Sequence, residues 1–313
     1  MKNIGFAAVA AFLSVGAAHA EWAPDGPIKV LIGFKAGGGA DSLARLLAED
    51  IQAREGWNLI PVNVDGSGGA IMARDLKDAR PDGLTIGVGI TDTFGYGLLA
   101  VRDPGYAADD FDFLATIAGT QIAVVAKADR GWHNLGDVIQ DARNGKAISF
   151  GAMTPRLANG AYYIGKANDV DFSIVSNFSG GQDVLNAISA GDVDIGWVAG
   201  PQKAGVQSGD LVNLANGEDL PLEMSPDAQK LGDLGVDFHF GTTFLALAPA
   251  DLPAEAKAAL SDAIIGAVED PDSKVSSFIQ RLFVPKTMGA DAARDYVDAE
   301  RQDAQNLLDA TAE

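Results

Sequence analysis

The loop after the first predicted strand carries residues that could bind an anion. It reads Lys35-Ala36-Gly37-Gly38-Gly39-Ala40-Asp41 and leads into a predicted helix. Glycine lets the backbone turn tightly and approach a ligand closely, and the first N–H groups of a helix lack partners within it. Such a loop can bind a carboxylate without a basic side chain. The same residues also suit a plain strand-to-helix turn with Asp41 as the N-cap, and this loop alone leaves both interpretations open.

Similar loops follow later predicted strands. They are Asp65-Gly66-Ser67-Gly68-Gly69, Thr91-Asp92-Thr93, Gly151-Ala152-Met153-Thr154-Pro155 and Ser179-Gly180-Gly181-Gln182. We predict Thr154 as an N-cap with Pro155 at the first helical position, and a capping box that begins at Ser179. Because ligands bind beyond the carboxyl ends of strands in open α/β sheets, we expect these loops to share one cleft. The predicted ligand-binding residues are Phe34, Lys35, Ala36, Gly37, Gly38, Gly39, Asp41, Thr91, Asp92, Gly151, Ala152, Met153, Thr154, Arg156, Ser179, Gly180 and Gly181.

Two cations lie in these loops, Lys35 and Arg156. Each could be a direct counter-ion, and Arg156 could bind a carboxylate through two parallel hydrogen bonds. Each could equally be a solvated surface residue, which we favour for Lys35. A direct pair between Arg156 and the ligand is the interpretation we carry forward for that residue.

The sequence gives little support for an enzyme. Beyond the first twenty residues it has two histidines, His133 and His239, far apart and outside any recognised motif. There is no HExxH, no cysteine and no G-x-S-x-G elbow. The segment Gly160–Ala167 approaches a P-loop, but it ends in alanine where Mg²⁺ needs a hydroxyl, and it falls inside a predicted helix. We therefore expect no cofactor, no metal and no catalysis.

The elements that position these loops read as alternating strands and helices. Leu43, Leu46, Leu47 and Ile51 recur at helical spacing after the first strand. The pattern predicts an α/β fold with doubly wound parallel sheets. The predicted strands are Ile28–Phe34, Leu59–Val64, Thr85–Ile90, Ala147–Phe150, Phe172–Val175 and Val193–Val198.

Two longer apolar segments do not fit the alternation of strands and helices, and they divide the chain. We interpret Phe111–Lys127 and Phe238–Ala248 as two crossing strands between lobes. The first lobe is then 21–119 plus 241–313, and the second lobe is 120–240. The predicted C-terminal helices, Ala254–Val268 and Ala290–Leu308, are expected to pack on the first lobe.

The first twenty residues are predicted to be a cleaved signal peptide. Lys2 precedes an apolar run from Ile4 to Val15, and Ala18-His19-Ala20 suits a signal peptidase. Export to the periplasm follows, with a mature chain that begins at Glu21. The chain is strongly acidic, with a formal net charge of −20, which disfavours nucleic acid and anionic membranes as partners.

Several blocks along the chain resemble a known family, the substrate-binding proteins of tripartite tricarboxylate transporters, also called Bug-type receptors. The segment from Gly33-Phe34 to Asp41, followed by Ala44-Arg45, is similar to the family pattern Pro-Phe-x-x-Gly-Gly-x-x-Asp-x-x-Ala-Arg. Each block is weak alone, but their order and spacing are specific and cover nearly the whole mature chain. The other similar blocks are Trp22-Ala23-Pro24 with Pro27-Ile28, Asp65 to Ala70, Pro81-Asp82-Gly83-Leu84-Thr85, Gly191-Asp192-Val193-Asp194, and Ala248 to Pro253.

The resemblance implies a Venus-flytrap fold that binds a small carboxylate between its lobes and serves membrane permease subunits, as a monomer. It assigns one carboxylate of the ligand to the loops Phe34–Asp41 and Gly151–Thr154, with Ser179–Gly181 nearby. This chain departs from the family at Gly33, where a proline is usual, at Arg156, near a usual histidine, and at Ser176-Asn177, where Pro-Tyr is usual. The alternatives are a binding protein for a sensor kinase and an exported α/β enzyme.

Overall fold

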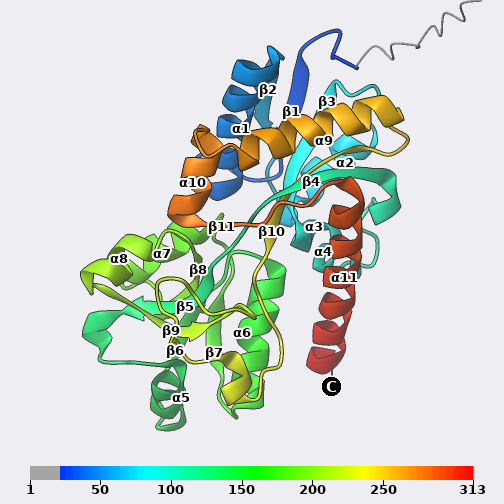
Figure 1. The fold of residues 1–313 in the computed structure, drawn as a ribbon. Coiled ribbons are helices and arrows are strands. Elements are labelled where there is room, and N and C mark those ends of the chain that lie inside the picture. The colour runs from blue at the N-terminus through cyan, green and yellow to red at the C-terminus, as the bar shows by residue number, and fades with distance from the viewer. Residues whose placement is uncertain (1–21, 313) are drawn as a thin grey trace, which may run out of the picture.

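Two separate β-sheets form the centres of two lobes (Figure 1). The computed structural model describes residues 22–312. The predicted signal peptide and the mature start at Glu21 lie outside the described residues. None of the helices described is both long enough and apolar enough to cross a membrane.

The sheet of the first lobe has the strand order β11-β4-β10-β3-β1-β2. β1, β2 and β3 are parallel, whereas β10 runs antiparallel to β3 and β4, and β11 runs antiparallel to β4. The prediction of parallel sheets is therefore correct for β1 to β3 and wrong for the whole sheet, because β10 enters this lobe from the other one. The strands are β1 (Ile28–Ile32), β2 (Leu59–Asn63), β3 (Thr85–Ile90), β4 (Phe111–Gly119), β10 (Thr243–Pro249) and β11 (Val284–Pro285).

The sheet of the second lobe has the order β7-β6-β8-β5-β9. β6 is parallel to β7 and β8, and β5 is antiparallel to β8 and β9. Here too the strand that arrives from the other lobe, β5, opposes the parallel set. The strands are β5 (Ile122–Lys127), β6 (Ile148–Gly151), β7 (Phe172–Val175), β8 (Ile195–Ala199) and β9 (Leu211–Asn216).

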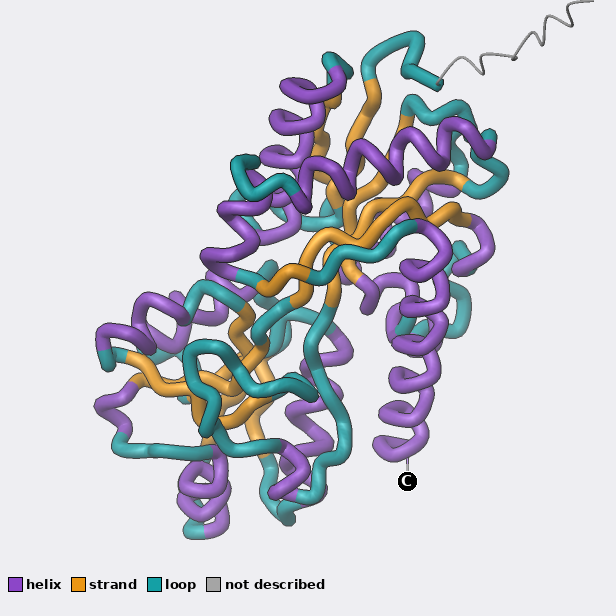
Figure 2. The backbone as a smooth tube through the Cα atoms, in the orientation of Figure 1, coloured by secondary structure: helices purple, strands orange, loops and turns teal. Residues whose placement is uncertain are grey.

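Helices cover both faces of each sheet (Figure 2). In the first lobe they are α1 (Gly39–Glu55), α2 (Ala70–Lys77), α3 (Thr91–Phe94), α4 (Tyr96–Ala100), α9 (Ala254–Glu269), α10 (Lys274–Leu282) and α11 (Ala290–Ala312). In the second lobe they are α5 (Leu135–Arg143), α6 (Pro155–Ala167), α7 (Gly181–Ala190) and α8 (Lys203–Ser208).

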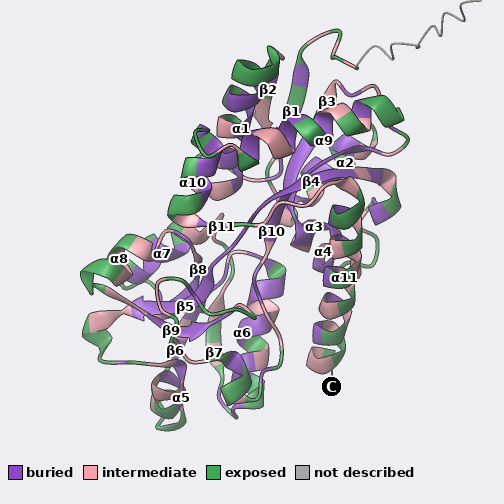
Figure 3. Ribbon diagram, in the orientation of Figure 1, coloured by how far each residue is buried: buried purple, intermediate pink, exposed green. Residues whose placement is uncertain are grey.

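Most strands are buried (Figure 3). They separate two apolar layers of side chains in each lobe. Successive side chains of a strand point to opposite faces of its sheet. Val30 accordingly packs in one layer of the first lobe and Leu31 in the other. Val124 and Val125 divide in the same way in the second lobe.

The two crossings differ from the long strands that were predicted. Phe111–Lys127 is two strands, β4 in one sheet and β5 in the other, with Thr120 and Gln121 between them. In Phe238–Ala248 the first residues form a loop, and β10 begins only at Thr243. Between the sheets the two crossings bond each other instead, with the Thr120 N–H donating to the Thr242 carbonyl at 3.0 Å. The lobe boundaries near residues 119 and 241 remain a prediction.

Helix α11 contacts both lobes, whereas it was predicted to pack only on the first. Ala293 and Val297 lie in an apolar cluster of the first lobe, while Ala304 and Leu307 lie in a cluster of the second lobe. Near its end, Thr311 Oγ1 and the Asn159 side chain of α6 are joined by a hydrogen bond of 3.0 Å. Amphipathic spacing predicts a helix but does not identify the surface that the helix covers. α11 thus connects the lobes in addition to the two crossings.

Candidate ligand-binding site

A cavity of about 420 Å³ lies between the lobes, within the range of small-molecule sites. It is bounded on one side by the loop after β1 and the start of α1. On the other side it is bounded by the loops before α6 and α7 and by the end of β8. The carboxyl ends of parallel strands from both sheets therefore meet at this cavity, as expected for α/β sheets.

The start of α1 faces this cavity without a side-chain cap. Its N-cap is Gly38, with extended backbone, and no side chain of the described residues bonds to the first helical N–H groups. Gly38 and Gly39 both line the cavity. A Cβ at Gly38 would have only the Lys35 carbonyl oxygen nearby, at 3.5 Å, so the space in front of this helix start belongs to the cavity.

Asp41 bonds the backbone of this loop on the side away from the cavity. The interpretation of Asp41 as the N-cap of α1 is wrong, because Gly38 is the N-cap. Asp41 is the third residue of α1, and its Oδ2 accepts the Gly37 N–H at 2.9 Å. Its Oδ1 accepts hydrogen bonds from Asn63 at 2.8 Å and Arg45 at 2.9 Å. Burial acts to raise the pKa of Asp41, but these bonds from Gly37, Asn63 and Arg45 together hold it below its usual value. Asp41 is therefore a fixed anion that shapes the loop and lies outside the cavity lining.

The start of α7 approaches the same cavity from the second lobe. Its N-cap is Gly180, again without a side-chain cap, so the predicted capping box at Ser179 does not form. Instead the Ser179 N–H donates to Asp183 Oδ2 at 3.2 Å. A Cβ at Gly180 would meet nothing within 4 Å. Two helix starts with glycine N-caps thus offer N–H groups to one cavity, an arrangement suited to an anion.

The start of α6 differs because its own residue caps it. Thr154 is the N-cap, as predicted, and Pro155 is the first helical residue. Thr154 Oγ1 accepts the Leu157 N–H at 3.2 Å. Thr154 lines the cavity. Its hydroxyl already accepts one of the free N–H groups at the start of α6.

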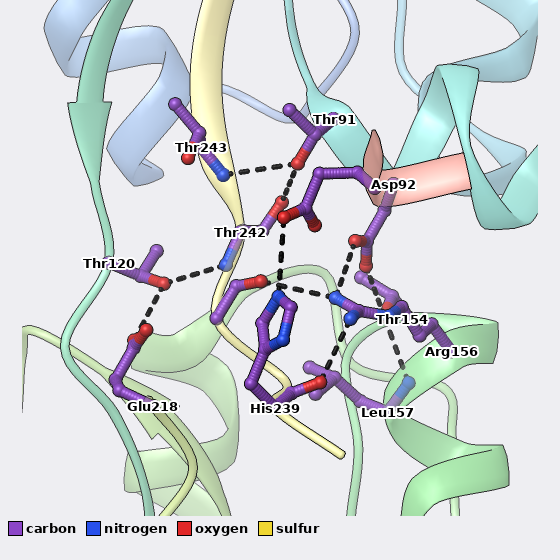
Figure 4. Close-up of polar contacts among 12 residues, drawn as sticks. Thr91, Asp92, Thr120, Thr154, Arg156, Leu157, Glu218, His239, Thr242 and Thr243 are labelled. Atoms are coloured by element: carbon purple, nitrogen blue, oxygen red, sulfur yellow. Dashed lines mark hydrogen bonds and ion pairs between the residues drawn. The ribbon is translucent and has the colours of Figure 1, made fainter. Parts of the chain in front are cut away.

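The two crossings contribute threonine hydroxyls to the cavity wall. Thr120 and Thr242 both line it, and the Thr242 N–H donates to Thr120 Oγ1 at 2.9 Å. Thr120 Oγ1 in turn donates to Glu218 Oε1 at 3.1 Å (Figure 4). Burial raises the pKa of Glu218 to about 7. Thr120 and Thr242 are therefore held in the cavity wall by a hydrogen bond between the two crossings.

Arg156 lies outside the cavity lining, and its guanidinium is engaged within the protein (Figure 4). Its side chain is 4% exposed, and Nη1 lies 3.2 Å from Asp92 Oδ1. The same guanidinium donates to the carbonyls of Gly241 at 3.1 Å and His239 at 2.9 Å. Burial raises the pKa of the Asp92 carboxyl, and Arg156 opposes that shift. The pair links α6 of the second lobe to α3 of the first and to the second crossing.

His239 forms a second buried contact, with Glu300 of α11. The His239 ring nitrogen Nε2 lies 3.2 Å from Glu300 Oε1, and this hydrogen bond raises the pKa of His239. Glu300 and Asp303 bring carboxylate oxygens within 4.8 Å of a His239 nitrogen, a spacing that a cation would require. Since His239 Nε2 is already hydrogen-bonded to Glu300 Oε1, we assign the group a structural role. His133 is exposed on the far side of the second lobe, before α5.

The predicted site residues divide into two groups. Those that line the cavity are Phe34, Lys35, Ala36, Gly37, Gly38, Gly39, Asp92, Met153, Thr154, Ser179, Gly180 and Gly181. Those that lie behind the lining are Asp41, Thr91, Gly151, Ala152 and Arg156. Thr91 is fully buried and bonds Thr242 at 3.0 Å.

Some lining residues lie outside the strand-to-helix loops and were not predicted. They come from the crossings, from the end of β8 and from the end of α10, and no local motif marks them. They include Thr120, Ile122, Ala199, Pro201, Phe240, Thr242, Phe244, Phe278, Leu282 and Phe283.

A second cavity, of about 640 Å³, lies in the same cleft. Ser67 and Gly68 bound it in the first lobe, and Asn159 and Tyr162 bound it in the second. Met153 and Thr154 line both cavities. Although this cavity is larger, we favour the first as the anion site, because the two helix starts with glycine N-caps face the first.

Comparison with known proteins places the chain among transport receptors. The family model for the tripartite tricarboxylate transporter family receptor matches residues 43–308. A UPF0065 protein of Bordetella bronchiseptica is 25% identical over 316 residues, covering 98% of this chain and 89% of the relative. The periplasmic binding protein BugD superposes with a TM-score of 0.80 at 20% identity, covering 93% of this chain and 99% of that one. The R. palustris protein Rpa4515 with adipate superposes with a TM-score of 0.82 at 20% identity, covering 92% of this chain and 98% of that one.

Replacing Gly38 tests the α1 start. Gly38→Val should fold, because the backbone there is extended and a Cβ has room. Its isopropyl group would stand in front of the helix N–H groups, so affinity for a carboxylate should fall at least tenfold by calorimetric titration. Gly26→Val, whose Cβ would lie 4.0 Å from Leu84 and outside both cavities, is the matched control. Unchanged affinity in a folded Gly38→Val protein would remove the α1 start from the site.

A double-mutant cycle tests the role of Arg156. Breaking a buried pair leaves an uncompensated charge, so Asp92→Asn and Arg156→Gln should each lower the free energy of unfolding by about 3–5 kcal/mol. The double variant should lose less free energy of unfolding than the sum of the two single variants' losses. Arg80→Gln, at a side chain 86% exposed, should stay within about 0.5 kcal/mol. Urea titration measures the stability of each variant, and calorimetric titration measures its ligand affinity. If Arg156→Gln keeps wild-type stability and loses only ligand affinity, Arg156 is a ligand counter-ion as first predicted.

Proposed function

The chain belongs to the tripartite tricarboxylate transporter receptor family, and on this premise we propose that it is a periplasmic receptor for a small carboxylate. It binds the ligand between its lobes and delivers it to the membrane subunits of a tripartite transporter. The periplasmic assignment is supported by the predicted signal peptide and by the similarity to BugD. Action as a monomer is part of this proposal.

The single observation that carries this proposal is the meeting of two helix starts with glycine N-caps at one cavity. A carboxylate has about four acceptor positions and no donor, which suits N–H groups that arrive from two directions. In the proposal, the N–H groups of Gly39 and Ala40 bind the ligand from the first lobe, and that of Gly181 binds it from the second. Lys35, exposed at the rim, adds attraction for an anion.

The bound adipate of the similar R. palustris protein is consistent with a carboxylate ligand. We propose binding without catalysis for this chain. Two pairs of buried ionisable groups bond within the protein, Arg156 with Asp92 and His239 with Glu300. In our proposal these pairs join helices and crossings to one another and take no part in chemistry.

A melting experiment with a panel of acids tests the proposal. The mature protein, residues 21–313, should be stabilised by at least one small carboxylate, because a ligand that binds only the folded state raises its stability. At 100 times the dissociation constant the gain is about 2.7 kcal/mol. The panel contains mono-, di- and tricarboxylates, with the matching neutral amides as controls. Stabilisation by the amides alone, or by no acid at millimolar concentration, would contradict a carboxylate receptor. The Gly38→Val protein should lose the response.

A further inference from the structure

An aromatic wall adjoins the anion site in the first cavity. Phe244, Phe278 and Phe283 all line this cavity. Their rings contact one another edge to face, with centroids 4.9 Å apart for Phe244 and Phe283 and 5.9 Å apart for Phe278 and Phe283. This wall is formed by β10, α10 and the residue after α10, far in the sequence from the glycine loop.

Gly39 brings the wall and the helix start into direct contact. A Cβ at Gly39 would lie 2.8 Å from the Phe283 ring and 3.3 Å from the Phe244 ring. The missing side chain therefore lets two rings pack against the first turn of α1. An anion bound to that turn would have its carbon body beside the rings.

The charged residues of this cavity disfavour a second carboxylate. Lys35 is the one cation in the lining within residues 22–312, and it is exposed at the rim. Asp92 and Asp183 also line the cavity, and Asp183 is exposed to solvent. Asp92 is 10% exposed, and Arg156, its counter-ion, is directed at Asp92 and two carbonyls. A second carboxylate buried here would lack a cationic partner and would approach acidic groups, which is costly in a desolvated site.

The lining of the cavity thus combines one anion site with an apolar surface and acidic neighbours. We propose that the ligand is a monocarboxylate with an apolar body of about the size of a phenyl ring, packed against Phe244, Phe278 and Phe283. The largely buried Asp92 discriminates against dicarboxylates. This inference rests on the proposed function, since it concerns the same site. Aromatic side chains supply large contact areas and favour ring partners.

Calorimetric titration of the mature protein with 3-phenylpropionate and adipate tests the inference. 3-Phenylpropionate should bind at least tenfold more tightly than adipate, because one carboxylate is satisfied and the ring is buried. If adipate binds as tightly or more tightly, the inference is overturned and the proposed function stands. If neither these acids nor the wider panel binds, the proposed function itself fails.

Two matched phenylalanine variants locate the binding surface. Phe278 is half-buried in the first cavity, and Phe178 is half-buried in the second. Phe278→Ala should weaken 3-phenylpropionate binding at least tenfold, which corresponds to about 1.4 kcal/mol. Phe178→Ala should leave it within about twofold. Melting curves establish that both variants are folded. The opposite pattern, with loss only in Phe178→Ala, would move the ring to the second cavity and contradict the proposal.

Discussion

The arrangement of parallel strands constrains the rest of this structure. β1 and β3 in one lobe, and β6 and β7 in the other, lead into helices that start at the cleft. A helix start must satisfy its free N–H groups with a cap, water or a ligand. Thr154 supplies a cap for α6, whereas Gly38 and Gly180 supply none for α1 and α7. This difference between threonine and glycine sets where an anion can bind.

The buried ion pair between Asp92 and Arg156 places the two lobes relative to each other. Its partners come from different lobes, and Nη1 and Nη2 of Arg156 also donate to two carbonyls of the second crossing. Burying charges is costly unless they are paired and hydrogen-bonded. The second crossing is therefore bonded to both lobes in this arrangement. α11, through Ala293 and Leu307, adds apolar contacts to both lobes as well.

Local features of the sequence predicted much of the fold. The strands Thr85–Ile90 and Phe172–Val175 and the start of α6 at Thr154-Pro155 were predicted at their observed positions, because apolar runs and capping residues act over a few positions. The sequence could not show that Arg156 is buried against Asp92, since that depends on how two lobes meet. The aromatic wall was missed for the same reason. Phe244 and Phe283 are remote from the glycine loop and meet Gly39 only in the folded chain.

The central claim is that backbone N–H groups at two helix starts hold one carboxylate. Nuclear magnetic resonance of the ¹⁵N-labelled mature protein tests it most directly, with the most stabilising carboxylate added to saturation. The account predicts that the amide signals of Gly39, Ala40 and Gly181 move together and by the largest amounts. The amide of Gly68, which lines the second cavity, should move little. Large shifts at Gly68 with none at Gly39 and Gly181 would contradict the account.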